Sequence, residues 1–140
     1  MKRYRSIAAI ILLSILLCSC GSRKAADGII STVEKTIGES DIYSAEDIDS
    51  AMQAVLDVFS KEFRRCTLKE LAYDEDTSIA ESGRRAEEYS ADKIIVLISS
   101  FDVDSVELED GLIAGSSYTD WLWILTRSEN EVWTVQDWGY

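Results

Sequence analysis

The segment 44–65 constrains the fold more than any other part of the chain, because its apolar residues recur with the period of an α-helix. Ser44 is a suitable N-cap, acidic residues follow it in the first turn, and basic residues close the last turn, as the helix dipole favours. The apolar stripe consists of Ile48, Met52, Val55, Leu56, Phe59 and Phe63. A helix with one apolar stripe has to bury it against a second layer, which the rest of the chain must supply.

That second layer is predicted to be a sheet. Residues 67–73 alternate loosely between apolar and polar, and residues 93–101 form a short apolar run rich in β-branched side chains, so both are predicted strands. A weaker helix is expected between them, over residues 77–90, with Ile79 among its few apolar residues. The last 22 residues, 119–140, are typical of a hairpin. We therefore predict an α+β domain with a long helix on an antiparallel sheet, in the order helix, strand, helix and three strands.

The register of the closing hairpin follows from its apolar pairs. A three-residue loop at 128–130 places Leu125 opposite Trp133 and Trp123 opposite Val135, with Asn130 in the left-handed conformation that such loops need. A two-residue loop would forfeit these pairs. The aromatic face predicted from this register comprises Trp121, Trp123, Leu125, Trp133 and Val135, with Asp137 at its end and Trp138 facing the other way.

Two interpretations of this aromatic face remain open. The indoles form the core beneath the helix, or they line a pocket in which indole N–H groups orient a ligand. In the second interpretation the pocket residues are Trp121, Trp123, Trp133 and Asp137, and burial would raise the pKa of the Asp137 carboxyl toward the range of acid-base chemistry. The alternative for Asp137 is a place at the rim, hydrogen-bonded to a backbone amide.

The chain contains no histidine, which excludes Ser-His-Asp and Cys-His nucleophiles and every zinc site that uses histidine. Cys66 follows Arg64 and Arg65 and is either a reactive thiol or, as we favour, a small buried residue at the start of a strand. We predict no catalytic residue, no cofactor and no metal site. The acidic loop 102–111 departs from the EF-hand template, because Val106 occupies a ligand position and Glu107 the position of the turn glycine. We favour a solvated loop, and the alternative is a looser calcium site that includes Glu107, Glu109 and Asp110.

The N-terminus has the layout of a secretory signal. Three basic residues precede an apolar run at 7–17, which is shorter than the roughly 20 residues that a membrane-spanning helix needs. The stretch LLCSC resembles a bacterial lipobox, with Leu17 three positions before Cys20 and small residues directly before it. We therefore predict a lipoprotein signal peptide over 1–19, a diacylglyceryl group on Cys20, a tether over 20–43 and one domain over 44–140.

The predicted tether holds one short apolar stripe at helical spacing, formed by Ile29, Ile30, Val33 and Ile37 and closed by Gly38. A helix this brief is marginal by itself, so it would dock on the domain or fray.

The charge of the chain argues against nucleic acid. The chain has 14 basic and 26 acidic residues, and removal of residues 1–19 takes away three basic residues and no acidic one, leaving a net charge of −15. Binding to nucleic-acid phosphates requires a cluster of Lys and Arg side chains, which this acidic chain is not expected to provide. Anionic lipids would repel the negative charge, so we expect the acyl chains to hold the protein at the membrane.

Four stretches together resemble a family of small lipoproteins from clostridia-like bacteria, a domain family of unknown function. They are IGESDIYSAEDI, CTLKELAYDED, YSADKIIVLISSFDVDS and the ending YTDWLWIL…VWTVQDWGY, and the resemblance covers residues 37–140. It implies an NTF2-like (cystatin-like) fold, in which a long helix packs on a strongly curved antiparallel sheet and leaves a conical pocket. Folds of this kind include enzymes and binding modules, and no catalytic motif of those enzymes matches this chain.

We therefore expect a lipid-anchored protein on the extracytoplasmic face of the cell membrane. Its expected role is that of a non-catalytic binding or interaction module of the cell envelope, with an envelope protein or a small ligand as its partner. The alternatives are a small pocket enzyme that uses Asp and Tyr side chains, and a protein-binding lipoprotein of the immunity or envelope-assembly type.

Overall fold

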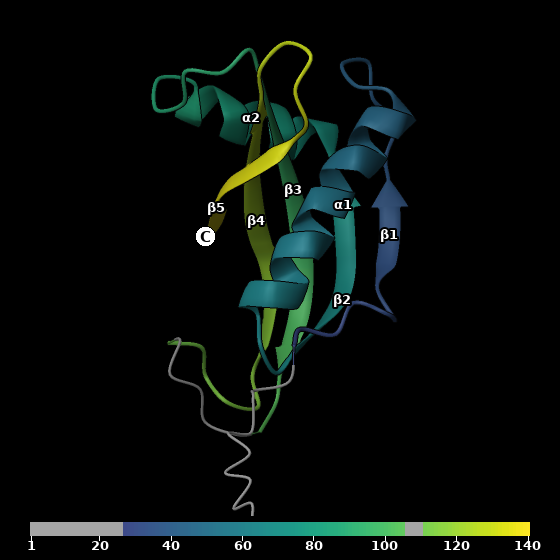
Figure 1. Cartoon of the computed structure of the whole chain (residues 1–140), viewed down its shortest axis with the longest axis vertical. Helices are drawn as coiled ribbons and strands as arrows, with labels where there is room; N and C mark the ends of the chain where they lie inside the picture. Colours follow the sequence, from purple (N-terminus) through teal and green to yellow (C-terminus); the bar gives the residue numbers. More distant parts are fainter. Residues whose placement is uncertain (1–26, 106–110) are drawn as a thin grey trace, which may run out of the picture.

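The computed structural model describes residues 27–105 and 111–140, and Cys20 with the predicted signal peptide lies outside them. The elements are β1 (Glu34–Ile37), α1 (Ala45–Glu62), β2 (Cys66–Tyr73), α2 (Glu75–Arg85), β3 (Lys93–Val103), β4 (Ser117–Arg127) and β5 (Thr134–Gly139). The five strands form one open sheet in sequence order, with β1 parallel to β2 and the other pairs antiparallel. The fold is α+β: α1 covers one face of the sheet, and α2 lies behind the sheet at one end (Figure 1).

The long helix is confirmed. Ser44 is its N-cap, and the Ser44 Oγ accepts a hydrogen bond of 3.1 Å from the backbone N–H of Asp47. All six residues of the predicted apolar stripe are buried against the sheet. Phe63 serves as the C-cap, and its ring still packs in the core although the helix ends at Glu62.

The element order begins with a strand, and the predicted short helix within residues 29–37 is wrong. Ile29 forms a parallel bridge with Thr67, and Glu34–Ile37 pairs with the second half of β2. Every residue of β1 is exposed, so apolar burial does not hold this strand in place. Pairing with β2 satisfies backbone N–H and C=O groups that a marginal four-residue helix would leave exposed. As a result the sheet is mixed, where we expected an antiparallel one.

The second helix, α2, begins two residues earlier and ends five residues earlier than the predicted range 77–90. Asp74 is its N-cap and accepts from the N–H of Thr77 at 2.9 Å. Ile79 is half-exposed, so it does not anchor the helix as expected. The buried Ser78 does so instead, since its Oγ accepts from the N–H of Val96 in β3 at 3.0 Å.

The closing hairpin forms, but its predicted register is wrong. Leu125 pairs with Val135 rather than with Trp133, and Trp123 pairs with Trp138. The connection is correspondingly longer and includes Trp133, although Asn130 does take the predicted left-handed conformation with φ at +63°. The apolar pairs that favoured the shorter loop are replaced by contacts of Trp133 with Tyr43, which lies outside the hairpin, and with Arg127 at the end of β4.

Three β-bulges decide which side chains face α1. In β2, Lys69 is the extra residue, so Leu68 and Leu71 both point into the core. In β4 a bulge that includes Asp120, with φ at +55°, brings Tyr118 and Trp121 to the same face. In β5 the bulge lies between the pairs Leu125–Val135 and Ile124–Asp137 and turns Trp138 toward α1. Bulges of this kind bend a strand and re-aim its side chains.

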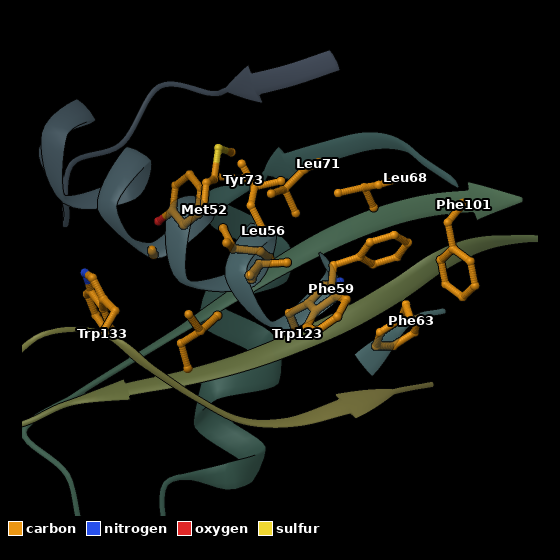
Figure 2. Close-up of a cluster of buried hydrophobic side chains, with 14 of the residues drawn as sticks. Met52, Leu56, Phe59, Phe63, Leu68, Leu71, Tyr73, Phe101, Trp123 and Trp133 are labelled. Carbon is orange, nitrogen blue, oxygen red and sulfur yellow. The ribbon is translucent and has the colours of Figure 1, made fainter. Parts of the chain in front are cut away.

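The core lies between α1 and the sheet and is rich in rings (Figure 2). Its largest fully buried side chains include Trp123, Phe59 and Phe101. A smaller buried set, with Val96 and Ile124, faces the side of the sheet that carries α2. Neither of the two helices in the described residues is long and apolar enough to cross a membrane.

Candidate functional site

Trp123 belongs to the core. Its side chain is fully buried, and its indole N–H donates to the Ser99 Oγ at 2.8 Å. The ring packs against Phe59 and Phe63 of the α1 segment. Because the indole is enclosed and its N–H already donates a hydrogen bond, Trp123 has neither accessible surface nor a free donor for a ligand.

Trp133 is also packed, at the far end of the same face (Figure 2). The guanidinium of Arg127 lies 4.4 Å from the centre of its ring, and the Tyr43 ring meets it edge-on at 5.7 Å. Arg127 also donates two hydrogen bonds, of 2.7 and 3.1 Å, to the carboxylate of Asp47 in the first turn of α1. These hydrogen bonds hold the pKa of the Asp47 carboxyl below its ordinary value. Trp133 is therefore part of a structural clamp between α1 and β4.

Asp137 does not share a face with the indoles. The bulge in β5 pairs it with Ile124 and directs its side chain toward α2, where it lies 4.0 Å from the Arg85 guanidinium. The side chain is 56% exposed, and one of its oxygens accepts from the N–H of Trp138 at 2.9 Å. The structure thus fits the alternative in which Asp137 is hydrogen-bonded to a backbone amide and not enclosed with the indoles.

Trp121 is the one predicted pocket residue that borders an opening in the surface. A groove of about 280 Å³ lies between the end of α1 and the outer strands, and its lining is formed by Glu62, Phe63, Arg64, Leu112, Trp121 and Trp138. The Phe63 ring contacts Trp138 at 5.7 Å and Trp121 at 6.2 Å between ring centres. Trp121 also meets Tyr140 edge-on at 5.2 Å. We call this site the aromatic groove.

Apolar and polar groups contribute about equally to the lining of the aromatic groove. Trp138 is 38% exposed, and Trp121 is half-buried, with an indole N–H that has no hydrogen-bond partner among the described residues. The two titratable side chains at the rim, Glu62 and Arg64, are both exposed to solvent. The site can therefore take up an apolar or aromatic group, but it contains no desolvated acid or base.

A second, more polar hollow lies at the opposite end of the sheet. It measures about 560 Å³ and is lined by residues of the loops before β3 and after β4, with Asp92, Lys93, Arg127 and Glu131 among them. Its charges have both signs, and Arg127 is already engaged by Asp47. This hollow has the mixed, solvated character of an ordinary surface depression.

Two further predictions concern Cys66 and the acidic loop. Cys66 is the first residue of β2 and fully buried, which confirms the interpretation as a small buried residue. In the acidic loop, Asp102 accepts from the Ser117 Oγ at 2.6 Å, while Asp104 lies 3.6 Å from Arg65. Glu107, Glu109 and Asp110 belong to the part of the loop outside the described residues. Within residues 27–105 and 111–140 no group of acidic or cysteine side chains is arranged to hold a metal ion.

Sequence reasoning missed most of the aromatic groove. The sequence predicts Phe63 as core and Trp138 on the opposite face, and it gives no indication of a role for Leu112. The bulge in β5 that brings Trp138 to this face breaks the alternation on which the register argument relied, whereas Trp121 keeps its predicted alternation with Trp123. Asp120 is a local signal only for the bulge in β4, which sets the face of Tyr118, because aspartate tolerates the left-handed conformation better than most residues.

Comparison with known proteins adds no relative. No protein-family model, no curated protein and no solved structure matches this chain.

Proposed function

We propose that the protein is a lipid-anchored, non-catalytic binding module on the extracytoplasmic face of the cell membrane, and that the aromatic groove is its binding surface. The lipobox-like LLCSC stretch supports the anchor on Cys20. The observation that carries the binding role is the open groove bordered by Trp121 and Trp138, the latter exposed although it is a large aromatic side chain. Exposed aromatic side chains beside a concavity are a common feature of binding sites.

The rival interpretation as a pocket enzyme has less support. An enzyme that uses acid-base chemistry without histidine needs a carboxyl or phenol group held in a dry site with a shifted pKa. Burial does raise the pKa of Tyr43 and of Tyr73, but the Tyr43 hydroxyl donates to the Ile94 carbonyl, and Tyr73 lies beside Glu75 and Ser40. Both phenols thus fasten the chain between β1 and α1 to the rest of the domain and lie away from the aromatic groove.

A protein-binding lipoprotein is the second candidate function, and one observation favours it. Ile113 and Tyr140 are exposed by 67% and 75%, so apolar surface extends from the groove onto its surroundings. We also propose the finer NTF2-like assignment of the fold, which rests on the helix packed across the sheet and on the resemblance of residues 37–140.

The proposed function is tested in two steps on the full chain in bacterial membranes. Mass spectrometry of the extracted protein should find residues 1–19 removed and a diacylglyceryl group on Cys20; an unmodified Cys20 would refute the anchor. A photo-reactive amino acid at position 138 should then form more cross-links than the same group at Val132, which is 79% exposed in the loop at the opposite end. Equal cross-linking at both positions would refute the groove as the binding surface.

A further inference from the structure

The described chain begins at the end of the domain that carries the aromatic groove. The N–H of Gly28 donates to the Ser60 carbonyl in the last turn of α1 at 3.0 Å. A Cβ atom added to Gly28 would lie 2.8 Å from the carbonyl oxygen of Phe63, so the backbone here rests directly on the segment that lines the groove. In Figure 1 the first described residues, the end of α1 and residues 111–117 lie together at the lower end, while α2 and the loop between β4 and β5 lie at the upper end.

The chain between the proposed anchor and this point is short. Six residues, 21–26, separate Cys20 from Asp27. Even a fully extended chain of that length reaches at most about 25 Å. A domain of this size is roughly 30–35 Å across. The anchored domain therefore keeps its groove end, and not its far end, within reach of the bilayer.

From these observations we infer that the aromatic groove docks onto the bilayer that holds the anchor, with Trp138, Trp121 and Ile113 in the interfacial layer. The inference rests on the proposed function, because it needs the lipid on Cys20. Trp and Tyr side chains favour the interface between acyl chains and water, where the ring is buried and the polar edge stays hydrated. Trp138, Tyr140 and Ile113 are exposed large apolar side chains on or beside the groove.

The charges around the groove determine whether it favours anionic or zwitterionic lipid. Glu62 and Arg64 both line the groove and carry opposite charges, and Arg65 forms an ion pair with Asp104. The net charge of −15 after signal removal gives no attraction to anionic lipid. The docking is thus held by apolar contact and occurs on zwitterionic lipid. Because the anchor makes docking an intramolecular step, a small patch is sufficient to orient the domain.

The inference is tested with the full lipidated chain in phosphatidylcholine vesicles whose acyl chains carry bromine, which quenches nearby indoles. We expect brominated lipid to quench the tryptophan fluorescence of the wild-type protein, and Trp138→Phe to show clearly less of this quenching, with Trp121 accounting for the remainder. The matched control is Trp133→Phe, which removes an indole that is 4% exposed at the far end and should leave the quenched portion unchanged. High salt should leave the quenching unchanged as well.

The outcomes separate the inference from the proposed function. If the vesicle-bound wild-type protein is quenched no more than the Trp138→Phe variant, the docking is wrong although the lipid anchor is present. A protein that fails to float with the vesicles and has an unmodified Cys20 overturns both. Protection of Trp138 from aqueous iodide in native membranes, but not in pure lipid vesicles, shows that a protein partner occupies the groove, and this result also overturns the docking.

Discussion

The two ends of the α1 face use aromatic side chains in opposite ways. At the far end Trp133 is covered by Tyr43 and by the Arg127 guanidinium, which Asp47 holds from the first turn of α1. At the groove end, Trp138 contacts Phe63 and Trp123 on one side and is open to solvent on the other. We call the first region the clamp end and the second the groove end.

This difference shows that the role of an indole depends on what covers it. A ring that is packed against neighbours and capped by a cation contributes to the stability of the fold. A ring that has one packed face and one open face is held rigidly while part of its surface remains available for binding. The predictions below test this contrast by removing one component of each end.

The largest effect is expected from the floor of the groove end. Phe101 is fully buried and contacts the rings of Phe59, Phe63, Tyr118 and Trp121, so Phe101→Ala should lower the free energy of unfolding by about 3–5 kcal/mol. Urea denaturation of the full chain in detergent measures this loss. Ile113→Ala, at a position that is 67% exposed, is the control and should change stability little. A loss below about 1 kcal/mol for Phe101→Ala would show that the rings do not form a shared core.

A smaller loss is expected at the clamp end. Arg127→Ala removes two hydrogen bonds to Asp47 and uncovers the Trp133 ring, and should lower the free energy of unfolding by about 2 kcal/mol. Arg127→Lys retains the charge but cannot form the same two hydrogen bonds, so its loss should fall between those of the wild type and of Arg127→Ala. If Arg127→Lys has the same free energy of unfolding as the wild type, the positive charge alone accounts for the stabilisation by the clamp.

The clamp end should also respond to acid. The pKa of Asp47 is lowered from 3.8 mainly by its hydrogen bond from Arg127, so the pair stabilises the folded state fully above this value. That stabilisation is lost as the pH falls through the lowered pKa. The stability difference between the wild type and Asp47→Asn should hence be constant near neutral pH and shrink below pH 3.8. A difference that persists unchanged in acid would contradict the assignment.

The smallest effect on stability is expected from the open ring. Trp138 is 38% exposed, so Trp138→Ala should lower the free energy of unfolding by less than about 2 kcal/mol. The same substitution should nevertheless lower the quenching of the protein by brominated lipid. A large destabilisation by Trp138→Ala, comparable with that of Phe101→Ala, would mean that Trp138 is a core residue like Trp123.

The sequence predicted the elements whose pattern is local. The cap at Ser44, the apolar stripe of α1, the strand that Cys66 begins and the apolar strand β3 all appear where their residues indicated. Each of these patterns is written in adjacent residues and depends on burial of one face. The left-handed Asn130 belongs to the same class, because it reflects a preference of the residue itself.

The remaining features were set by contacts between distant segments. Residues 34–37 have no local strand pattern and become β1 only because the edge of β2 is available for pairing. The hairpin register differs from the predicted one because Trp133 packs against Tyr43, which lies far from it in sequence, and under the Arg127 guanidinium. A register argument that considers only the two strands of a hairpin cannot include such contacts.

By itself, the sequence determined that this chain carries a lipobox-like N-terminus, a helix with one apolar stripe and an α+β domain, since these follow from the order and spacing of neighbouring residues. Only the tertiary structure decided which indole is open. The bulge in β5 turns Trp138 toward the end of α1, beside Trp121, and turns Asp137 away from it. The physical reason is that one extra residue in a strand reverses the face of every side chain beyond it, and whether that residue is accommodated depends on the packing of the whole sheet.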